Sequence, residues 1–219
     1  MPSLRCFTSL LAAVVLVTAT CAEPTPPQND PIPPPEQSET GAAAAQVLVG
    51  AGQIARCDYS NDERTAQLLD GIAGTVFTLG DNVRASGSLS DYQSCYAPSW
   101  GRHTARTRPS AGDLEYDYPD AAGYFGYFGS AAGPAGKGYY SYELGEWHIV
   151  VLNSNISTYV GSPQETWLKQ DLAANPRQCT LAYWHHPRFS SRGSIVREYT
   201  KPLWDDLYAA GAEVVLNGH

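Results

Sequence analysis

Three short apolar runs in this chain each end at a residue type that binds divalent metals. Residues 75–79 lead into Gly80-Asp81, residues 179–184 into His185-His186, and residues 213–216 into Asn217-Gly218-His219. Short runs rich in β-branched and aromatic residues, flanked by Gly, Pro and Asn, are typical of buried strands. Because ligands in open α/β sheets gather beyond the carboxyl ends of the strands, the pattern predicts that Asp81, His185 and His219 meet at one cation.

The remaining pattern predicts alternating strands and helices. Further strands are expected at residues 46–49 and 147–152. Capping boxes beginning at Ser60 and Ser162 predict helices that run through Leu69 and end before Pro176, and a third helix over residues 202–210 closes at Gly211. Residues 86–140 show poor periodicity, which predicts long loops with one short helix over residues 89–96. A strand–helix–strand order of this length predicts parallel pairing and an α/β fold.

Composition narrows the class of protein. With 219 residues, of which 43% are hydrophobic, the chain can build one sizeable globular domain. The formal net charge of −8 and the sequence pI near 5.0 argue against nucleic-acid binding, which normally uses a basic patch. We therefore expect no nucleic-acid partner.

Residues 1–22 have the pattern of an export signal. Arg5 provides a positive charge, residues 10–18 form a short apolar stretch, and Thr20-Cys21-Ala22 offers a small-residue cleavage site. The stretch is too short to cross a bilayer comfortably, so a transmembrane helix is the weaker interpretation. We expect an exported protein, secreted or periplasmic. Lipidation of Cys21 is the alternative, and it is the one route to a membrane that the sequence offers.

Residues 23–45 predict a Pro-rich linker, because their composition favours an extended, solvated chain without a core. The folded domain is then 46–219, and it contains Cys57, Cys95 and Cys179. Export makes disulfides chemically feasible, and Cys57 with Cys95 is the pair we predict. The alternative is that all three are buried free thiols.

The order of the motifs resembles that of a known family. The motifs are Gly80-Asp81-Asn82, Gly112-Asp113-Leu114-Glu115, His185-His186-Pro187 and Gly218-His219. Together they are similar to those of the calcineurin-like metallophosphoesterases, and most similar to the secreted branch related to purple acid phosphatases. The resemblance covers roughly residues 47–219. It implies a four-layer α/β/β/α sandwich, a two-metal site at the strand ends, and hydrolysis of a small-molecule or other phosphorylated substrate.

The resemblance also implies a metal-binding role for four side chains. Asp81 matches the carboxylate that bridges the two metals of the family. Asp113, His185 and His219 match the positions of an Asn, a His that follows a strand, and the first His of Gly-His-x-His, which complete the shell of one metal. Oxygen and nitrogen donors of this kind suit Fe, Zn or Mn. The second histidine of the His185-His186 pair is given the lesser role.

Several positions depart from the family pattern. Gln53 stands in place of a metal-binding Asp, Arg84 in place of a Tyr, and Leu114 in place of a His that assists the leaving group or the transition state. The family's second His of Gly-His-x-His lies beyond His219, so we expect the domain to be incomplete at its C-terminus. The other metal keeps Asp81 as its one strong ligand. We therefore expect one metal ion rather than two, with no catalytic residue assigned.

The carboxylate of Asp113 also changes the charge of the site. Two carboxylates and two neutral imidazoles cancel a dication, whereas the family pattern leaves one positive charge over. Cation affinity should therefore rise, while Lewis acidity and attraction for phosphate fall. The leading hypothesis is an exported, metal-dependent phosphoesterase of the acid-phosphatase type with weakened activity. The alternatives are a catalytically inactive relative that binds metal or phosphate, and a truncated gene product.

Overall fold

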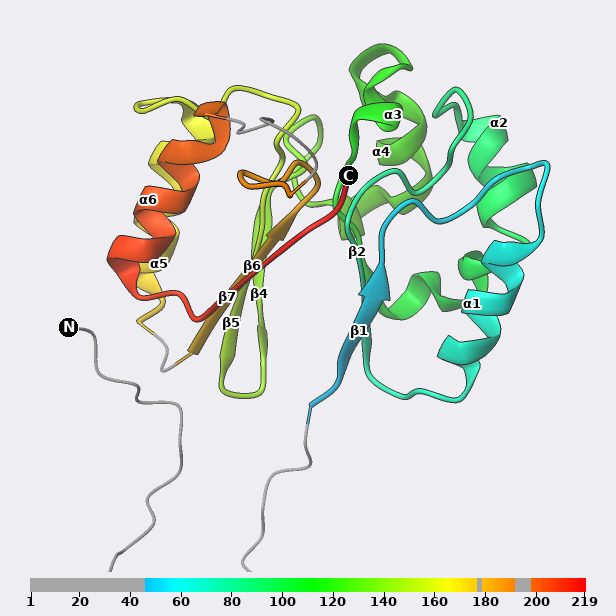
Figure 1. The fold of residues 1–219 in the computed structure, drawn as a ribbon, viewed down its shortest axis with the longest axis horizontal. Helices are drawn as coiled ribbons and strands as arrows, with labels where there is room; N and C mark the ends of the chain where they lie inside the picture. Colours follow the sequence, from blue (N-terminus) through cyan, green and yellow to red (C-terminus); the bar gives the residue numbers. More distant parts are fainter. Residues whose placement is uncertain (1–45, 177–178, 192–197) are drawn as a thin grey trace, which may run out of the picture. The chain divides into compact units, whose positions relative to one another are not determined.

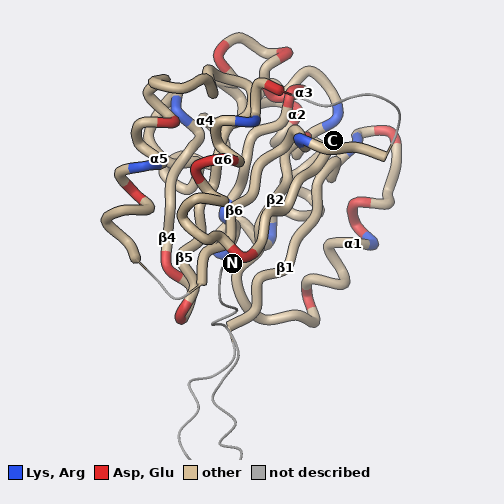
Figure 2. Tube along the Cα trace, turned by 60° about the vertical axis from the view of Figure 1, so that its left-hand side comes forward, with Lys and Arg blue, Asp and Glu red and all other residues tan. Residues whose placement is uncertain are grey.

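The computed structural model describes residues 46–176, 179–191 and 198–219. The predicted signal (1–22), with Cys21, and the predicted linker (23–45) lie outside the described residues and stay predictions. No described helix combines the length and the apolar character needed to cross a bilayer. Acidic and basic positions are interspersed along the described trace (Figure 2).

The strands of the described residues form two sheets (Figure 1). The first has the order β1-β2-β3, with strands β1 (Leu48–Ala51), β2 (Thr75–Thr78) and β3 (Thr107–Arg108), all parallel. The second has the order β4-β5-β6-β7, with strands β4 (Tyr140–Leu144), β5 (Trp147–Val151), β6 (Cys179–Trp184) and β7 (Val214–Asn217). Strand β4 pairs antiparallel with β5, and the other pairs are parallel. The predicted parallel pairing is confirmed, whereas β3 and β4 were missed.

Three clusters of apolar side chains arrange these sheets and the helices in four layers. Helix α1 (Asn61–Asp70) and the turns after β2 pack on β1 and β2 around Val76, Tyr92 and Trp100. Helices α5 (Pro163–Ala174) and α6 (Lys201–Ala210) cover the other sheet through Leu168, Leu203 and Leu207. A third cluster lies between the sheets. It joins Phe77 of β2 to Ile149, Val151 and Tyr183, with the Phe77 and Tyr183 ring centroids 5.4 Å apart. The predicted helix–sheet–sheet–helix sandwich is confirmed.

The stretch 86–140 contains far more structure than the predicted loops. Its helical elements are α2 (Leu89–Asp91), η1 (Tyr92–Tyr96), η2 (Trp100–Arg106), α3 (Asp113–Tyr116), η3 (Pro119–Ala121), α4 (Ala122–Phe128) and η4 (Gly129–Ala132). The turns are too short to show helical periodicity. Aromatic rings hold them together instead, since Tyr92, Tyr96 and Tyr127 each lie within 6 Å of the Phe128 ring or of one another.

The two predicted capping boxes have different outcomes. Ser162 precedes α5 with extended backbone, and its hydroxyl accepts the Glu165 N–H at 3.2 Å. The box at Ser60 is wrong, because the ψ angle of 16° at Ser60 turns the backbone away from the extended geometry that a cap requires. Both acidic residues of that turn are used elsewhere. Asp62 is buried and accepts the Ser99 hydroxyl at 2.6 Å, and Glu63 pairs with Arg102 at 2.8 Å.

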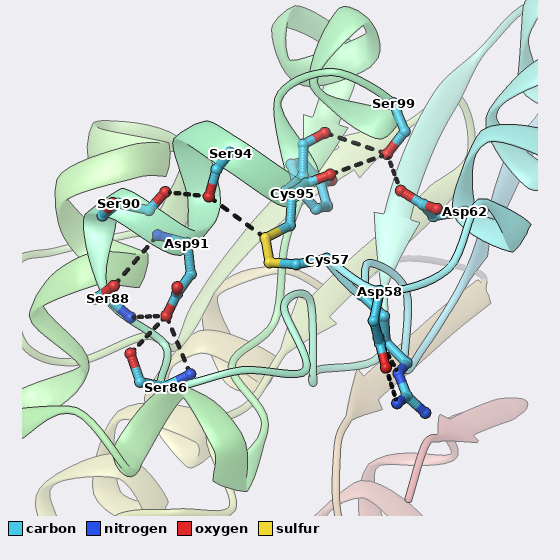
Figure 3. The surroundings of a disulfide bond; sticks show 12 residues. Cys57, Asp58, Asp62, Ser86, Ser88, Ser90, Asp91, Ser94, Cys95 and Ser99 are labelled. Atoms are coloured by element: carbon cyan, nitrogen blue, oxygen red, sulfur yellow. Dashed lines mark hydrogen bonds and ion pairs between the residues drawn. A yellow bond between two sulfur atoms is a disulfide. The ribbon is translucent and has the colours of Figure 1, made fainter.

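A disulfide joins Cys57, in the loop between β1 and α1, to Cys95 of η1 (Figure 3). The predicted pairing of these two residues is confirmed. The bond closes a loop with a sequence separation of 38. In the chain-entropy model, closing a loop of this length stabilises the folded protein by about 4 kcal/mol, because the crosslink restricts the unfolded chain. The double variant Cys57→Ser/Cys95→Ser should therefore lose about 2–4 kcal/mol of unfolding free energy in urea titration; an unchanged midpoint would contradict this.

A buried histidine, His148 of β5, lies between two carboxylates on the α5 side of its sheet. Its Nδ1 is 2.8 Å from Glu143 of β4, and its Nε2 is 2.8 Å from Asp171 of α5. Burial disfavours the imidazolium, but the hydrogen bonds to Asp171 and Glu143 outweigh burial and raise the pKa of His148. The pair of contacts is a local, pH-dependent source of stability.

We expect the contribution of His148 to be fully present below its unfolded-state pKa of about 6.5 and to be lost as the pH rises through the higher folded-state pKa. Urea titrations between pH 5.5 and 9 should show this loss in the wild type. His148→Gln removes the titrating group, so its unfolding free energy should fall less over the same range. Parallel curves for the two proteins would show that His148 does not carry the effect.

Candidate metal centre

Four side chains from three separate parts of the chain converge at the carboxyl ends of the strands. Asp113 begins α3, His185 and His186 follow β6, and His219 follows β7. One ligand atom of each lies within 4.8 Å of those of the other three. Both views of the trace place the C-terminal residue beside α3 (Figures 1 and 2). Of the four predicted ligands, the structure brings Asp113, His185 and His219 into this group.

His185 is the most constrained member of the group. It is fully buried, and its Nδ1 lies 2.6 Å from the Leu79 carbonyl, which can only accept, so Nδ1 carries the proton. Nε2 therefore points into the group, 2.7 Å from Asp113 Oδ1 and 3.1 Å from His219 Nδ1. A histidine whose second nitrogen is held by a carbonyl is the usual arrangement of a metal ligand.

His186 joins the group although the sequence interpretation gave it the lesser role. Its Nδ1 lies 3.0 Å from the Ser154 hydroxyl, and its Nε2 lies 3.7 Å from Asp113 Oδ1. Its ring centroid is 4.7 Å from that of His219. Adjacent residues in an extended strand point to opposite faces, so a continued strand would not bring both histidines to one site. The chain leaves β6 before His185, however, so that alternation no longer applies.

Asp81 lies at the edge of the group. Its carboxylate is nearly buried, with Oδ1 3.3 Å from His185 Nε2 and accepting the Leu114 N–H at 3.3 Å. Its backbone has a φ of 51°, a conformation that few residues other than glycine adopt. Asp81 and His185 therefore lie as close together as predicted. The role of Asp81 as a metal ligand stays a prediction.

Two glycines permit the close packing of the loops that carry the ligands. A Cβ on Gly80 would lie 2.6 Å from His185 Nδ1, and a Cβ on Gly112 would lie 2.2 Å from the Asp81 nitrogen. Gly80 also has a φ of 78°. Any side chain at either position would push the loops apart, so glycine is needed there for the ligands to meet.

A fully buried carboxylate, Glu115, forms hydrogen bonds with the backbone of both loops, the one at Gly80 and the one at Gly112. It accepts the backbone N–H groups of Gly112, Asp81 and Asn82 at 2.5, 3.0 and 2.8 Å. The Tyr92 hydroxyl donates to it as well, at 3.0 Å. The last residue of the Gly112–Glu115 motif is thus a backbone acceptor that fixes Asp81 relative to Asp113. Nothing in the sequence distinguished this use from a ligand role.

Replacing Glu115 should therefore destabilise both the fold and the site. Glu115→Ala leaves several buried N–H groups without an acceptor, and we expect a loss of about 3–5 kcal/mol of unfolding free energy. Glu115→Gln keeps one acceptor oxygen and should lose less. Urea denaturation of both variants checks the order; a Glu115→Ala protein as stable as the wild type would contradict the assignment.

The two carboxyls of the site have opposite pKa shifts. Burial, together with the charge of Asp113, raises the pKa of Asp81 above its usual value. Burial also acts on Asp113, but the adjacent His185 outweighs it and lowers the pKa of Asp113. The side chain of Asp113 is 43% exposed, whereas that of Asp81 is 4% exposed. Asp113, the carboxylate within the group of four, therefore stays ionised more readily than Asp81.

The departures from the family pattern also lie around this centre. Leu114 is half-buried next to Asp113, and its backbone holds Asp81. Gln53 donates its backbone N–H to the Gly80 carbonyl at 3.0 Å, and Gln53 and Arg84 line one cavity.

Comparison with known proteins supports the relationship that the motifs indicate. The chain matches no protein-family model. It is 37% identical over 87 residues to purple acid phosphatase 15 of Arabidopsis thaliana, a match that covers 37% of this chain and 16% of that protein. The fold is similar to that of purple acid phosphatase PPD1 from yellow lupin (Lupinus luteus) seeds, with a TM-score of 0.55 and 18% sequence identity.

The structural match covers 80% of this chain and 37% of the lupin protein, so the chain spans well under two thirds of either relative. The predicted fold type is confirmed by the architecture and by this match. The predicted relationship is confirmed by the sequence match, which is independent of the fold comparison. The chain is related to the purple acid phosphatases and has the calcineurin-like metallophosphoesterase fold.

Proposed function

We propose that this chain binds one transition-metal ion through Asp81, Asp113, His185 and His219, with His186 as a further donor beside them, and that it is an exported phosphoesterase of weakened activity. The observation that carries the proposal is the convergence of four ligand atoms within 4.8 Å at the carboxyl ends of the strands. Such a group, built from three separate parts of the chain, is what a metal centre requires.

The donor set fits a transition metal better than Mg²⁺ or Ca²⁺. Imidazole nitrogens suit Zn, Fe and related ions, whereas Mg²⁺ and Ca²⁺ take oxygen ligands almost exclusively. The protonated Nδ1 of His185, held by the Leu79 carbonyl, directs Nε2 toward the ion in advance. We therefore name Fe, Zn or Mn as the cofactor, consistent with the relationship to purple acid phosphatases.

The proposed activity is hydrolysis of a phosphate ester. A bound transition-metal ion supplies Lewis acidity toward the phosphate oxygens. Asp81, Asp113 and the imidazoles would hold the ion in place. The two carboxylates also reduce the positive charge that the ion presents to the substrate. Leu114 has no proton to donate to a leaving group, and the loss of a positioned acid typically costs about 10²–10⁴-fold in rate. These two features support a slow enzyme.

Export is supported by the Cys57–Cys95 disulfide, since disulfides persist mainly in oxidising compartments. We therefore propose a secreted or periplasmic location, with lipidation of Cys21 as the proposed route to membrane attachment. The partner is then a small-molecule or other phosphorylated substrate. The alternative function is that of a metal-binding relative without turnover, which the missing acid at Leu114 favours.

The test is an assay of the full chain on a chromogenic phosphomonoester, with Mn, Fe and Zn supplied in turn. We expect slow, metal-dependent hydrolysis that Asp81→Ala reduces. Turnover that survives Asp81→Ala unchanged would indicate a contaminating phosphatase and contradict the proposal. One tightly held ion without turnover would establish the metal-binding alternative instead.

A further inference from the structure

A cavity of about 260 Å³ lies between the loop that follows β1 and the loop that follows β2. Its lining residues are Gln53, Ile54, Arg56, Tyr59, Asn61, Asp62 and Arg84. This is smaller than the roughly 300–1,000 Å³ of sites for drug-sized ligands, so the cavity can hold a group of a substrate rather than a whole large one. We call it the Arg84 cavity.

The Arg84 cavity is adjacent to the metal centre. Ile54, in its wall, donates its N–H to the Asp81 carbonyl at 2.9 Å, and Gln53 donates to the Gly80 carbonyl at 3.0 Å. Arg84 donates its backbone N–H back to the Ala55 carbonyl at 2.8 Å. The two loops therefore run side by side, and the wall of the cavity is connected directly to the backbone of Asp81.

The charge of the cavity is suited to an anion. Its charged lining residues are Arg56, Arg84 and one carboxylate, Asp62, whose Oδ2 accepts the Ser99 hydroxyl. The charge of Arg56 is balanced by its ion pair with Asp58, so Arg84 is the cation that the cavity offers to an anion. Arg84 has an exposed side chain, and no ion pair or hydrogen bond of its guanidinium occurs within the part of the chain that the structure describes. Arginine is the side chain best suited to bind phosphate oxygens, because its planar group donates two parallel hydrogen bonds.

The wall that carries Arg56 is fixed in place. Asp58 accepts from Arg56 at 2.9 and 2.7 Å, and the guanidinium carbon lies 4.5 Å from the centre of the Tyr59 ring. The intervening Cys57 is crosslinked to Cys95, so the loop is anchored to η1 (Figure 3). A site that is fixed before binding loses less entropy when the ligand enters.

We propose that the Arg84 cavity binds a phosphate group, and that it takes a second phosphate of a substrate whose first phosphate is at the metal centre. The first half of this inference needs no metal. The second half rests on the proposed function, because it assigns the substrate class as esters that carry two or more phosphate groups. Arg84 is then a residue that determines specificity.

Phosphate binding to the metal-free full chain tests the first half directly. After chelator treatment and dialysis, calorimetric titration with inorganic phosphate should show one site. We expect Arg84→Gln to weaken the affinity by about tenfold or more, the effect of one hydrogen bond between charged groups. Arg64→Gln is the matched control, because Arg64 is an exposed arginine of α1 outside the cavity and should bind as the wild type does. Absence of phosphate binding, or equal binding by Arg84→Gln, would overturn the proposal.

Kinetics of the metal-loaded chain test the second half. With a sugar bisphosphate, Arg84→Gln should raise KM about tenfold and leave kcat unchanged, whereas with a chromogenic monophosphate KM should stay the same. An equal effect on both substrates would overturn the assignment of a second-phosphate site. If neither substrate is hydrolysed by any form, the proposed function fails, and the calorimetric result still decides whether the cavity binds phosphate.

Discussion

Asp113→Ala is expected to lower the affinity for the metal ion by at least about 100-fold and to remove phosphoesterase activity with it. Loss of residues that merely orient a ligand costs roughly 10–100-fold, and Asp113 is proposed as a ligand itself. Its Oδ1 lies 2.7 Å from His185 Nε2 and 3.2 Å from His219 Nδ1. Removing it takes away the one carboxylate in the group of four.

The exposure of Asp113 makes this substitution interpretable. Its side chain is 43% exposed, so alanine should fold normally, whereas His185→Ala would also open space in a fully buried site. Asp117→Ala is the control, because Asp117 is an exposed carboxylate at the other end of α3. Competition titration against a chromogenic chelator measures the three affinities. Wild-type affinity in Asp113→Ala would show that the ion binds elsewhere or not at all.

The second large expected effect is a gain in catalytic rate. Introducing the histidine that the family carries, in the variant Leu114→His, should raise kcat by about 10²–10⁴-fold, the usual contribution of a positioned acid. Leu114 is half-buried, and its backbone N–H is held 3.3 Å from Asp81 Oδ1. The backbone of a histidine at position 114 therefore lies next to Asp113 and within hydrogen-bond distance of the Asp81 carboxylate.

The pH profile separates a proton donor from a merely polar side chain. Leu114→His should add an ionisation to the dependence of kcat on pH, whereas Leu114→Gln should add none and leave kcat near that of the wild type. Metal content must be measured in both variants. A Leu114→His protein that holds its metal and shows no rise in kcat would contradict the role assigned to this position.

The local pattern was sufficient for an α/β fold with parallel strands and for most of the centre, whereas the four-layer sandwich was implied by the family resemblance. Asp81, His185 and His219 each follow a short buried strand, and parallel strands bring their carboxyl ends to one edge. The sequence left two alternatives open for the cysteines, and the Cys57–Cys95 disulfide is the one that the structure contains.

What the sequence could not supply depends on contacts between residues far apart. The turns between residues 86 and 140 are held by aromatic rings such as Tyr92 and Phe128, and that packing leaves no periodic signal. The buried carboxylate of Glu115 accepts backbone N–H groups from two loops at once, which no local pattern encodes. The serine at position 60 had the right neighbours for a cap but the wrong backbone angle.

The most direct test of the account is the number of metal ions bound by the full chain. After loading with Zn and removal of excess ion, elemental analysis should give one ion per chain in the wild type and essentially none in Asp113→Ala, at equal protein concentration. Retention of the ion by Asp113→Ala, or a wild type that binds no ion, would contradict the centre described above.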